Sequence, residues 1–163
     1  MFNCGVCRNI LDYDITLKSL NMKNDLDELP EGMRIGIKTE FLNIKEENNN
    51  LIMPFSLDLV GLIENVEEDS IERSLKDELE KPYDENDNDL AFKINVIYNL
   101  KLDFNEKLKE EDKNSSELKN YAYFLLEPTL RELVASIGGK IGLPGLTLPK
   151  VNRKIKDGNN NKL

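Results

Sequence analysis

The chain has 163 residues, of which 39% are hydrophobic and 33% charged, and its net charge is −9. This length suffices for one domain with a core of its own. The acidic balance argues against a nucleic-acid partner, because phosphate backbones are repelled. There is neither an apolar run of the roughly 18 residues that a transmembrane helix needs nor a signal peptide at the N-terminus. We therefore expect a cytoplasmic protein without membrane insertion.

A Cys-x-x-Cys motif, Cys4-Gly5-Val6-Cys7, opens the chain. A redox role would require the motif at the N-terminus of a helix that follows a strand. A structural zinc site would require two more ligands, and the chain has no histidine and no third cysteine. We interpret the pair as ordinary cysteines in a mobile N-terminus, with a transient zinc or partner contact as the alternative.

Four segments alternate between apolar and polar residues with the period of a β-strand. In the first, 10–22, the phase slips after Leu17 so that Leu20 and Met22 take over, which predicts a bulge. The second and third, 33–45 and 51–63, flank a hairpin loop, and Pro54 predicts an unpaired edge in the third. The fourth, 90–104, alternates without a break and would span about 50 Å.

Residues 65–89 form an insertion between the third and fourth strands. Asp69 and Glu72 resemble a capping box, which predicts a short, mostly exposed helix that ends before Pro82. A solvated acidic loop should follow it.

The main helix is predicted over 116–137, where apolar residues recur every three or four positions. Ser115 or Ser116 can cap its N-terminus. Pro128 should kink it, and Gly138-Gly139 should end it. The tail 153–163 has too few apolar residues to pack and is expected to be disordered.

Strands followed by one long helix indicate an α+β fold with an antiparallel sheet. One helix cannot cover both faces of so long a sheet, so the remaining apolar side chains need another cover. A second subunit is the simplest one. These side chains include Leu42, Ile44, Val60 and Leu62.

The chain offers little for catalysis. It has no histidine, its carboxylates cluster in solvated runs, and no glycine-rich loop joins a strand to a helix. We expect a binding protein and not an enzyme, with no catalytic residue, no cofactor and no metal.

Two motifs near the C-terminus are the most specific features of the chain. Pro128-x-x-Arg131-Glu132 lies in the helix, and 142–152 reads Gly-Leu-Pro-Gly-Leu-Thr-Leu-Pro-Lys-Val-Asn. Together they resemble the C-terminal half of the SecB family of bacterial export chaperones, strongly over 121–152 and weakly through the strands. The resemblance implies one SecB-like domain over 1–152: a four-stranded antiparallel sheet packed by one long helix, with the insertion between strands three and four. It also implies a homotetramer, built as a dimer of dimers.

By resemblance, the activity is that of an ATP-independent holdase that binds unfolded or precursor proteins, for protein export. The alternatives are a dedicated chaperone of a toxin–antitoxin or other single client, and a non-chaperone oligomeric scaffold. The family docks on SecA through an acidic sheet face. Asp14 matches that pattern, whereas Lys18, Lys93 and Asn95 depart from it, which favours a dedicated client.

Strand alternation and the extended segment supply the predicted client-binding residues. Apolar rows on long strands can bind chains of any sequence, because the site needs area and not particular chemistry. The extended segment has a second interpretation, in which it only covers the core and pins the chain end. The predicted residues are Ile35, Ile37, Phe41, Phe55, Leu57, Leu59, Leu143, Leu146 and Leu148.

Overall fold

The computed structural model describes residues 5–24, 32–63, 75–81 and 91–148. Several sequence-based predictions fall outside these residues. They concern Cys4, the capping box of Asp69 and Glu72, the end of the extended segment from Pro149, and the tail 153–163.

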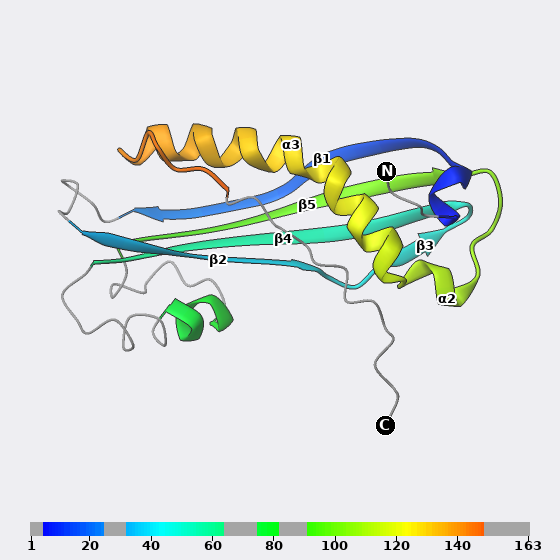
Figure 1. The fold of residues 1–163 in the computed structure, drawn as a ribbon, viewed down its shortest axis with the longest axis horizontal. Coiled ribbons are helices and arrows are strands. Elements are labelled where there is room, and N and C mark those ends of the chain that lie inside the picture. Colours follow the sequence, from blue (N-terminus) through cyan, green and yellow to red (C-terminus); the bar gives the residue numbers. More distant parts are fainter. Residues whose placement is uncertain (1–4, 25–31, 64–74, 82–90, 149–163) are drawn as a thin grey trace, which may run out of the picture.

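The fold is α+β, with an antiparallel sheet and one long helix (Figure 1). The sheet has the strand order β1-β5-β4-β2, and a short strand β3 pairs with β4. It therefore has five strands where the sequence predicted four. The bounds are β1 Ile10–Asn24, β2 Met33–Phe41, β3 Lys45–Glu47, β4 Asn50–Ile63 and β5 Phe92–Phe104.

The extra strand arises because Pro54 interrupts the ladder. The N–H of Leu42 donates to the carbonyl of Pro54 at 2.8 Å, but Pro54 has no N–H to return. Pairing with β4 stops there and resumes where Lys45 lies opposite Ile52. The predicted strand 33–45 is thus divided into β2 and β3. The gap in pairing expected from Pro54 is present, although β4 is an interior strand and Pro54 still accepts a hydrogen bond from Leu42.

The predicted bulge in β1 is confirmed. The register with β5 shifts between Leu17 and Ser19, so Leu17 lies opposite Tyr98 and Leu20 opposite Val96. Both leucines therefore point to the same face of the sheet, although they are three residues apart.

The helix α3 (Ser116–Lys140) packs on one face of the sheet, called here the helix face. The Ser115 hydroxyl caps it by accepting from the N–H of Leu118 at 3.2 Å. Pro128 lies at its midpoint, and Figure 1 shows that the helix changes direction along its length. The core between helix and sheet includes Phe55, Leu57, Leu59, Ile94, Val96, Leu100, Leu118, Leu126 and Leu130, all almost fully buried.

The described part of the insertion is helical at 75–80 and lies against the opposite, outer face of the sheet. A side chain on Gly36 would lie 3.1 Å from both Leu79 and Val60 and 3.2 Å from Leu75. The buried Lys93 amine donates to the carbonyl of Glu78 at 3.2 Å. Val60, which we expected a second subunit to cover, is therefore buried within the protomer. The helix is also less exposed than predicted, because Glu78 is buried.

At the other end of the sheet lie a 3-10 helix, η1 (Val6–Asn9), and a short helix, α2 (Glu110–Lys113). Cys7 is in a disulfide, so the interpretation of this residue as an ordinary thiol is wrong. Among the described residues, no helix is long and apolar enough to cross a membrane.

Candidate peptide-binding groove

The segment that follows α3, residues 142–148, is called the strap here. It begins with a Schellman motif, in which Gly142 has φ 81° and the N–H of Leu143 donates to the carbonyl of Gly138 at 2.7 Å. The helix thus continues to Lys140, three residues beyond its predicted end at residue 137, and passes through Gly138-Gly139, which were expected to end it. Gly142 supplies the left-handed backbone that the sequence assigned to that earlier pair.

The strap then makes a tight turn. The N–H of Leu146 donates to the carbonyl of Leu143 at 3.0 Å, with Pro144 and Gly145 in the two central positions. Proline favours the first of these positions because its φ is already fixed. After the turn, Leu146 and Leu148 are buried in the core while Thr147 is exposed.

The strap lies close against α3 at both of its ends. At its start it can approach only because Gly138 has no side chain: a Cβ on Gly138 would lie 2.6 Å from the Leu143 carbonyl oxygen and 2.8 Å from Cβ of Leu146. At its end, Nη1 of Arg131 donates to the carbonyl of Leu148 at 3.0 Å. The other edge of the guanidinium is held by one carboxylate oxygen of Glu127, at 2.9 Å from Nε and 2.6 Å from Nη2.

A groove of about 460 Å³ lies between the strap and β2. Two isoleucines of β2, Ile35 and Ile37, form one side, and both point to the helix face because they lie opposite Gly61 and Leu59 of β4. The strap forms the other side. Its lining residues are Gly142, Leu143, Pro144, Gly145, Leu146 and Thr147.

The backbone of β2 offers hydrogen-bonding groups beside this groove. β2 is the last strand of the described sheet. The bond from Leu42 to Pro54 fixes which pairs of the ladder are hydrogen-bonded, and such pairs alternate in antiparallel sheets. The N–H and C=O groups of Ile35, Ile37 and Thr39 therefore face away from β4, toward the open edge.

The structure brings four of the nine predicted client-binding residues together at the groove, namely Ile35, Ile37, Leu143 and Leu146. Phe41 is half-buried and packs edge-to-face on Phe55 with ring centroids 4.9 Å apart. The remaining residues are buried in the core, and none lines the groove. They are Phe55, Leu57, Leu59 and Leu148.

Sequence reasoning missed that Gly142, Pro144, Gly145 and Thr147 also line the groove. The Gly/Pro punctuation of the extended segment was the available signal, since such residues shape a tight turn that exposes its backbone. Strand alternation could not find these residues, because they do not lie in a strand. It also could not distinguish the apolar side chains of β4, which α3 covers, from those of β2, which line the groove.

The residue predicted for translocase docking, Asp14, lies on the outer face of β1. It is exposed, sits opposite Lys101 of β5, and accepts a hydrogen bond from the Thr16 hydroxyl at 3.0 Å. Lys93, which departs from the acidic docking pattern, is buried under the helix at 75–80.

The helix face of β1 remains partly uncovered. Tyr13, Leu17, Leu20 and Met22 lie opposite core residues of β5, yet each is between 43% and 49% exposed. On α3, Phe124 is 52% exposed. Apolar surface of this kind, gathered along one edge of a sheet, is typical of an interaction site.

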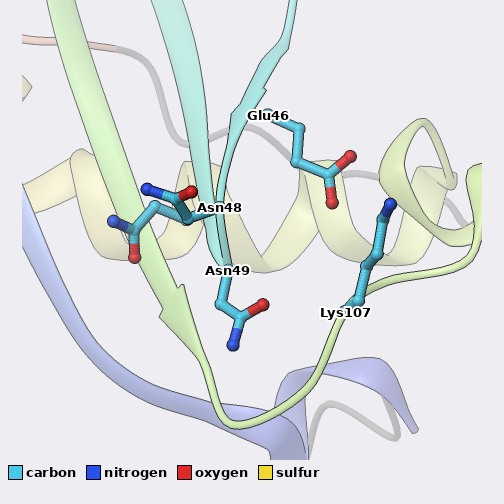
Figure 2. A pocket seen from close by; sticks show the side chains of 5 residues that line it. Glu46, Asn48, Asn49 and Lys107 are labelled. Carbon is cyan, nitrogen blue, oxygen red and sulfur yellow. The ribbon is translucent and has the colours of Figure 1, made fainter.

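A second hollow, at the tip of the β3–β4 hairpin, is polar and open (Figure 2). Glu46, Asn48, Asn49, Asn50 and Lys107 line it. Lys113 forms ion pairs with Glu46, which lines this hollow, and with Glu110. The side-chain hydrogen bonds from Lys113 to Glu110, which has the larger effect, and to Glu46 raise the pKa of the Lys113 amine. The same bond to Lys113 lowers the pKa of the Glu110 carboxyl. In the described residues, no group of acidic or cysteine side chains is placed to hold a metal ion.

Comparison with known proteins decides the fold. No protein-family model and no curated protein sequence matches the chain. Among solved structures, the chain is similar to the Mycobacterium tuberculosis Rv1957 SecB-like chaperone in complex with a ChAD peptide from the Rv1956 HigA1 antitoxin. The TM-score is 0.60 at 17% identity, over 92% of this chain and 96% of that one.

The chain has a SecB-like fold. The expectation drawn from the two C-terminal motifs is thereby confirmed for the architecture. In this SecB-like fold the strap is the extended segment that carried the resemblance, and Arg131 of the helix motif is the residue that fastens it.

Proposed function

We propose that this SecB-like protein is an ATP-independent holdase that binds apolar segments of unfolded client proteins in the groove between β2 and the strap. The observation that carries the proposal is the apolar groove itself, which lies beside an open strand edge. A client segment in extended form gains apolar burial from Ile35, Ile37 and Leu143, and strand-like pairing from the backbone groups of β2 that face away from β4.

Self-assembly is the second part of the proposal. The uncovered helix face of β1 and the exposed Phe124 of α3 are apolar surface on two different elements of the protomer. A dimer of dimers needs two such isologous contacts, and burial in a partner copy would remove both from water. We therefore propose a homotetramer whose protomers each keep a groove.

A dedicated client is favoured over general export. Two observations support this preference: the similar structure carries an antitoxin peptide, and on the outer face Lys93 is buried under the insertion and cannot contribute to docking. Under this proposal Asp14 contributes little to any translocase contact, and SecA is at most a weak partner.

The proposed function can be tested with a reduced, slowly aggregating client protein in the absence of nucleotide. We expect the wild-type protein to suppress light scattering near one oligomer per client. The double variant Ile35→Ser, Ile37→Ser should lose most of this activity while keeping its fold by circular dichroism. Leu11→Ser is the matched control, because Leu11 is 70% exposed in the first bulge of β1, at the opposite edge of the sheet.

The same experiment separates the alternatives. Absence of suppression at excess wild-type protein, together with a stable oligomer, supports a scaffold and contradicts the holdase. Suppression that the Ile35→Ser, Ile37→Ser variant retains contradicts the groove as the binding site. A dedicated chaperone is distinguished from a general one by testing several unrelated clients, since it should suppress the aggregation of few of them.

A further inference from the structure

The strap is held in the client-free structure by hydrogen bonds, and the two residues of α3 to which it is bonded, Gly138 and Arg131, lie outside the groove. Its two turns are closed by backbone hydrogen bonds, from Leu143 to Gly138 at 2.7 Å and from Leu146 to Leu143 at 3.0 Å. Its far end is bound through the carbonyl of Leu148 to Arg131. Neither Gly138 nor Arg131 lines the groove.

We propose that Gly138 and Arg131 are the positioning residues of the groove, which hold the strap at a set distance from β2 so that the groove is open and shaped in the free protein. This inference rests on the proposed function of the groove. It adds that client affinity depends on two residues of α3 that never touch the client.

Gly138 acts through the absence of a side chain. A Cβ at this position would lie closer to the Leu143 oxygen and to Leu146 than real Cβ atoms approach their neighbours. Both of these neighbours belong to the strap. A larger residue at 138 must therefore push the strap away from α3 and change the shape of the groove. The neighbouring Gly139 has nothing within 4 Å of its would-be Cβ, and it therefore offers a matched control.

Arg131 acts through the shape of its guanidinium. Glu127 occupies Nε and Nη2 with one oxygen and leaves Nη1 directed at the Leu148 carbonyl. A lysine carries one nitrogen on an unbranched stem and cannot reproduce both contacts in this planar arrangement. Arg131→Lys thus keeps the charge of α3 but removes the bridge to the strap.

The consequence for binding follows from preorganisation. A strap that is already ordered loses little conformational entropy when a client binds. A loosened strap must become ordered on binding, and this entropy loss weakens the net binding free energy. We expect loosened variants to release the client faster, because most affinity differences between variants of one site lie in the dissociation rate.

The test combines hydrogen exchange with peptide binding. In the free wild-type protein, the amides of Leu143 and Leu146 should be protected. Gly138→Ala and Arg131→Lys should speed their exchange and should weaken binding of a fluorescently labelled peptide of alternating leucine and threonine by about tenfold. Gly139→Ala and Lys140→Gln, a charge change at the exposed end of the same helix, should leave exchange and affinity as in wild type.

If Gly138 and Arg131 only stabilised the fold, their variants would lower the melting temperature without changing the rate at which peptide dissociates from the groove. The ratio of dissociation rates at 25 °C is therefore compared between variants that remain fully folded. Faster strap exchange with unchanged peptide dissociation would overturn the inference and leave the proposed function standing, as would unchanged exchange in both variants. A wild-type protein that binds no peptide would overturn the proposed function, and the inference with it.

Discussion

Arg131 and Leu148 are joined by a hydrogen bond of 3.0 Å, from the guanidinium of one to the backbone carbonyl of the other, across 17 residues of sequence. This contact links the two C-terminal motifs. It explains in physical terms why an arginine one turn after Pro128 accompanies an extended leucine segment: the helix carries the donor, and the segment supplies the carbonyl that accepts from it.

The left-handed residue that starts the strap should be sensitive to any side chain. Gly142 has φ 81°, a conformation that costs an L-residue roughly 1–2 kcal/mol. We expect Gly142→Ala to lower the free energy of unfolding by about that amount in urea denaturation. Gly145→Ala is the control, since its Cβ would meet nothing within 4 Å. Equal losses in both variants would contradict the Schellman assignment.

Gly36 should be essential for docking the inserted helix. A larger side chain would press on Leu75, Leu79 and Val60, which already lie within 3.2 Å of the missing Cβ. We expect Gly36→Val to cost about 1–3 kcal/mol of stability through overpacking and to speed amide exchange at 75–80. Unchanged exchange there would show that this helix does not pack on the outer face.

The ion pairs of Lys113 should make stability depend on pH in a defined window. The pKa of Glu110 is lowered from its ordinary value of 4.5, so its contribution is present above that value and lost as pH falls through the lowered one. The pKa of Lys113 is raised from 10.5, so its contribution is present below 10.5 and lost as pH rises through the raised value.

Lys113→Met should therefore lower the melting temperature most between these two limits. The wild-type and variant curves should converge toward strongly acidic and strongly alkaline pH. Lys109→Met, at an exposed position just before α2, should run parallel to wild type at all pH values. A constant difference between wild type and Lys113→Met would argue that the lysine contributes only through packing.

Assembly should depend on the uncovered face of β1. We expect Leu17→Glu combined with Leu20→Glu to reduce the mass measured by light scattering, because each change would bury a charge in the proposed interface. The wild-type mass should be about four times the 18.7 kDa of one chain. Leu11→Glu serves as control, and a wild-type monomer of 18.7 kDa would contradict the assembly proposal.

Periodicity predicted the sheet and helix well because these elements bury one face each. The bulge after Leu17 was recognisable from the slip in alternation, the N-terminal cap from two adjacent serines, and the break in pairing at Pro54 from a residue without an N–H. The end of α3 was not recognisable from the sequence, because Gly138-Gly139 and Gly142 lie within five residues and either site could end the helix. Only the contact of Gly138 with the strap shows that its small size serves packing and that Gly142 ends the helix.

Four of the nine predicted client-binding residues line the groove. Strand alternation put Ile35 and Ile37 of β2 on the same face of the sheet as Leu57 and Leu59 of β4, but Leu57 and Leu59 are buried under α3. Alternation assigns a side chain to a face of the sheet but not to its edge or centre. The strand order, with β2 outermost, determines which row stays open, and that order depends on long-range pairing that no local pattern encodes.

Backbone amide exchange along β2, with and without bound client, tests the central claim most directly. The N–H groups of Ile35 and Ile37 face the open edge, whereas those of Arg34 and Gly36 face β4. We predict that a bound apolar peptide slows exchange at Ile35 and Ile37 and leaves Arg34 and Gly36 unchanged. Suppression of client aggregation with no change at Ile35 and Ile37 would contradict the account.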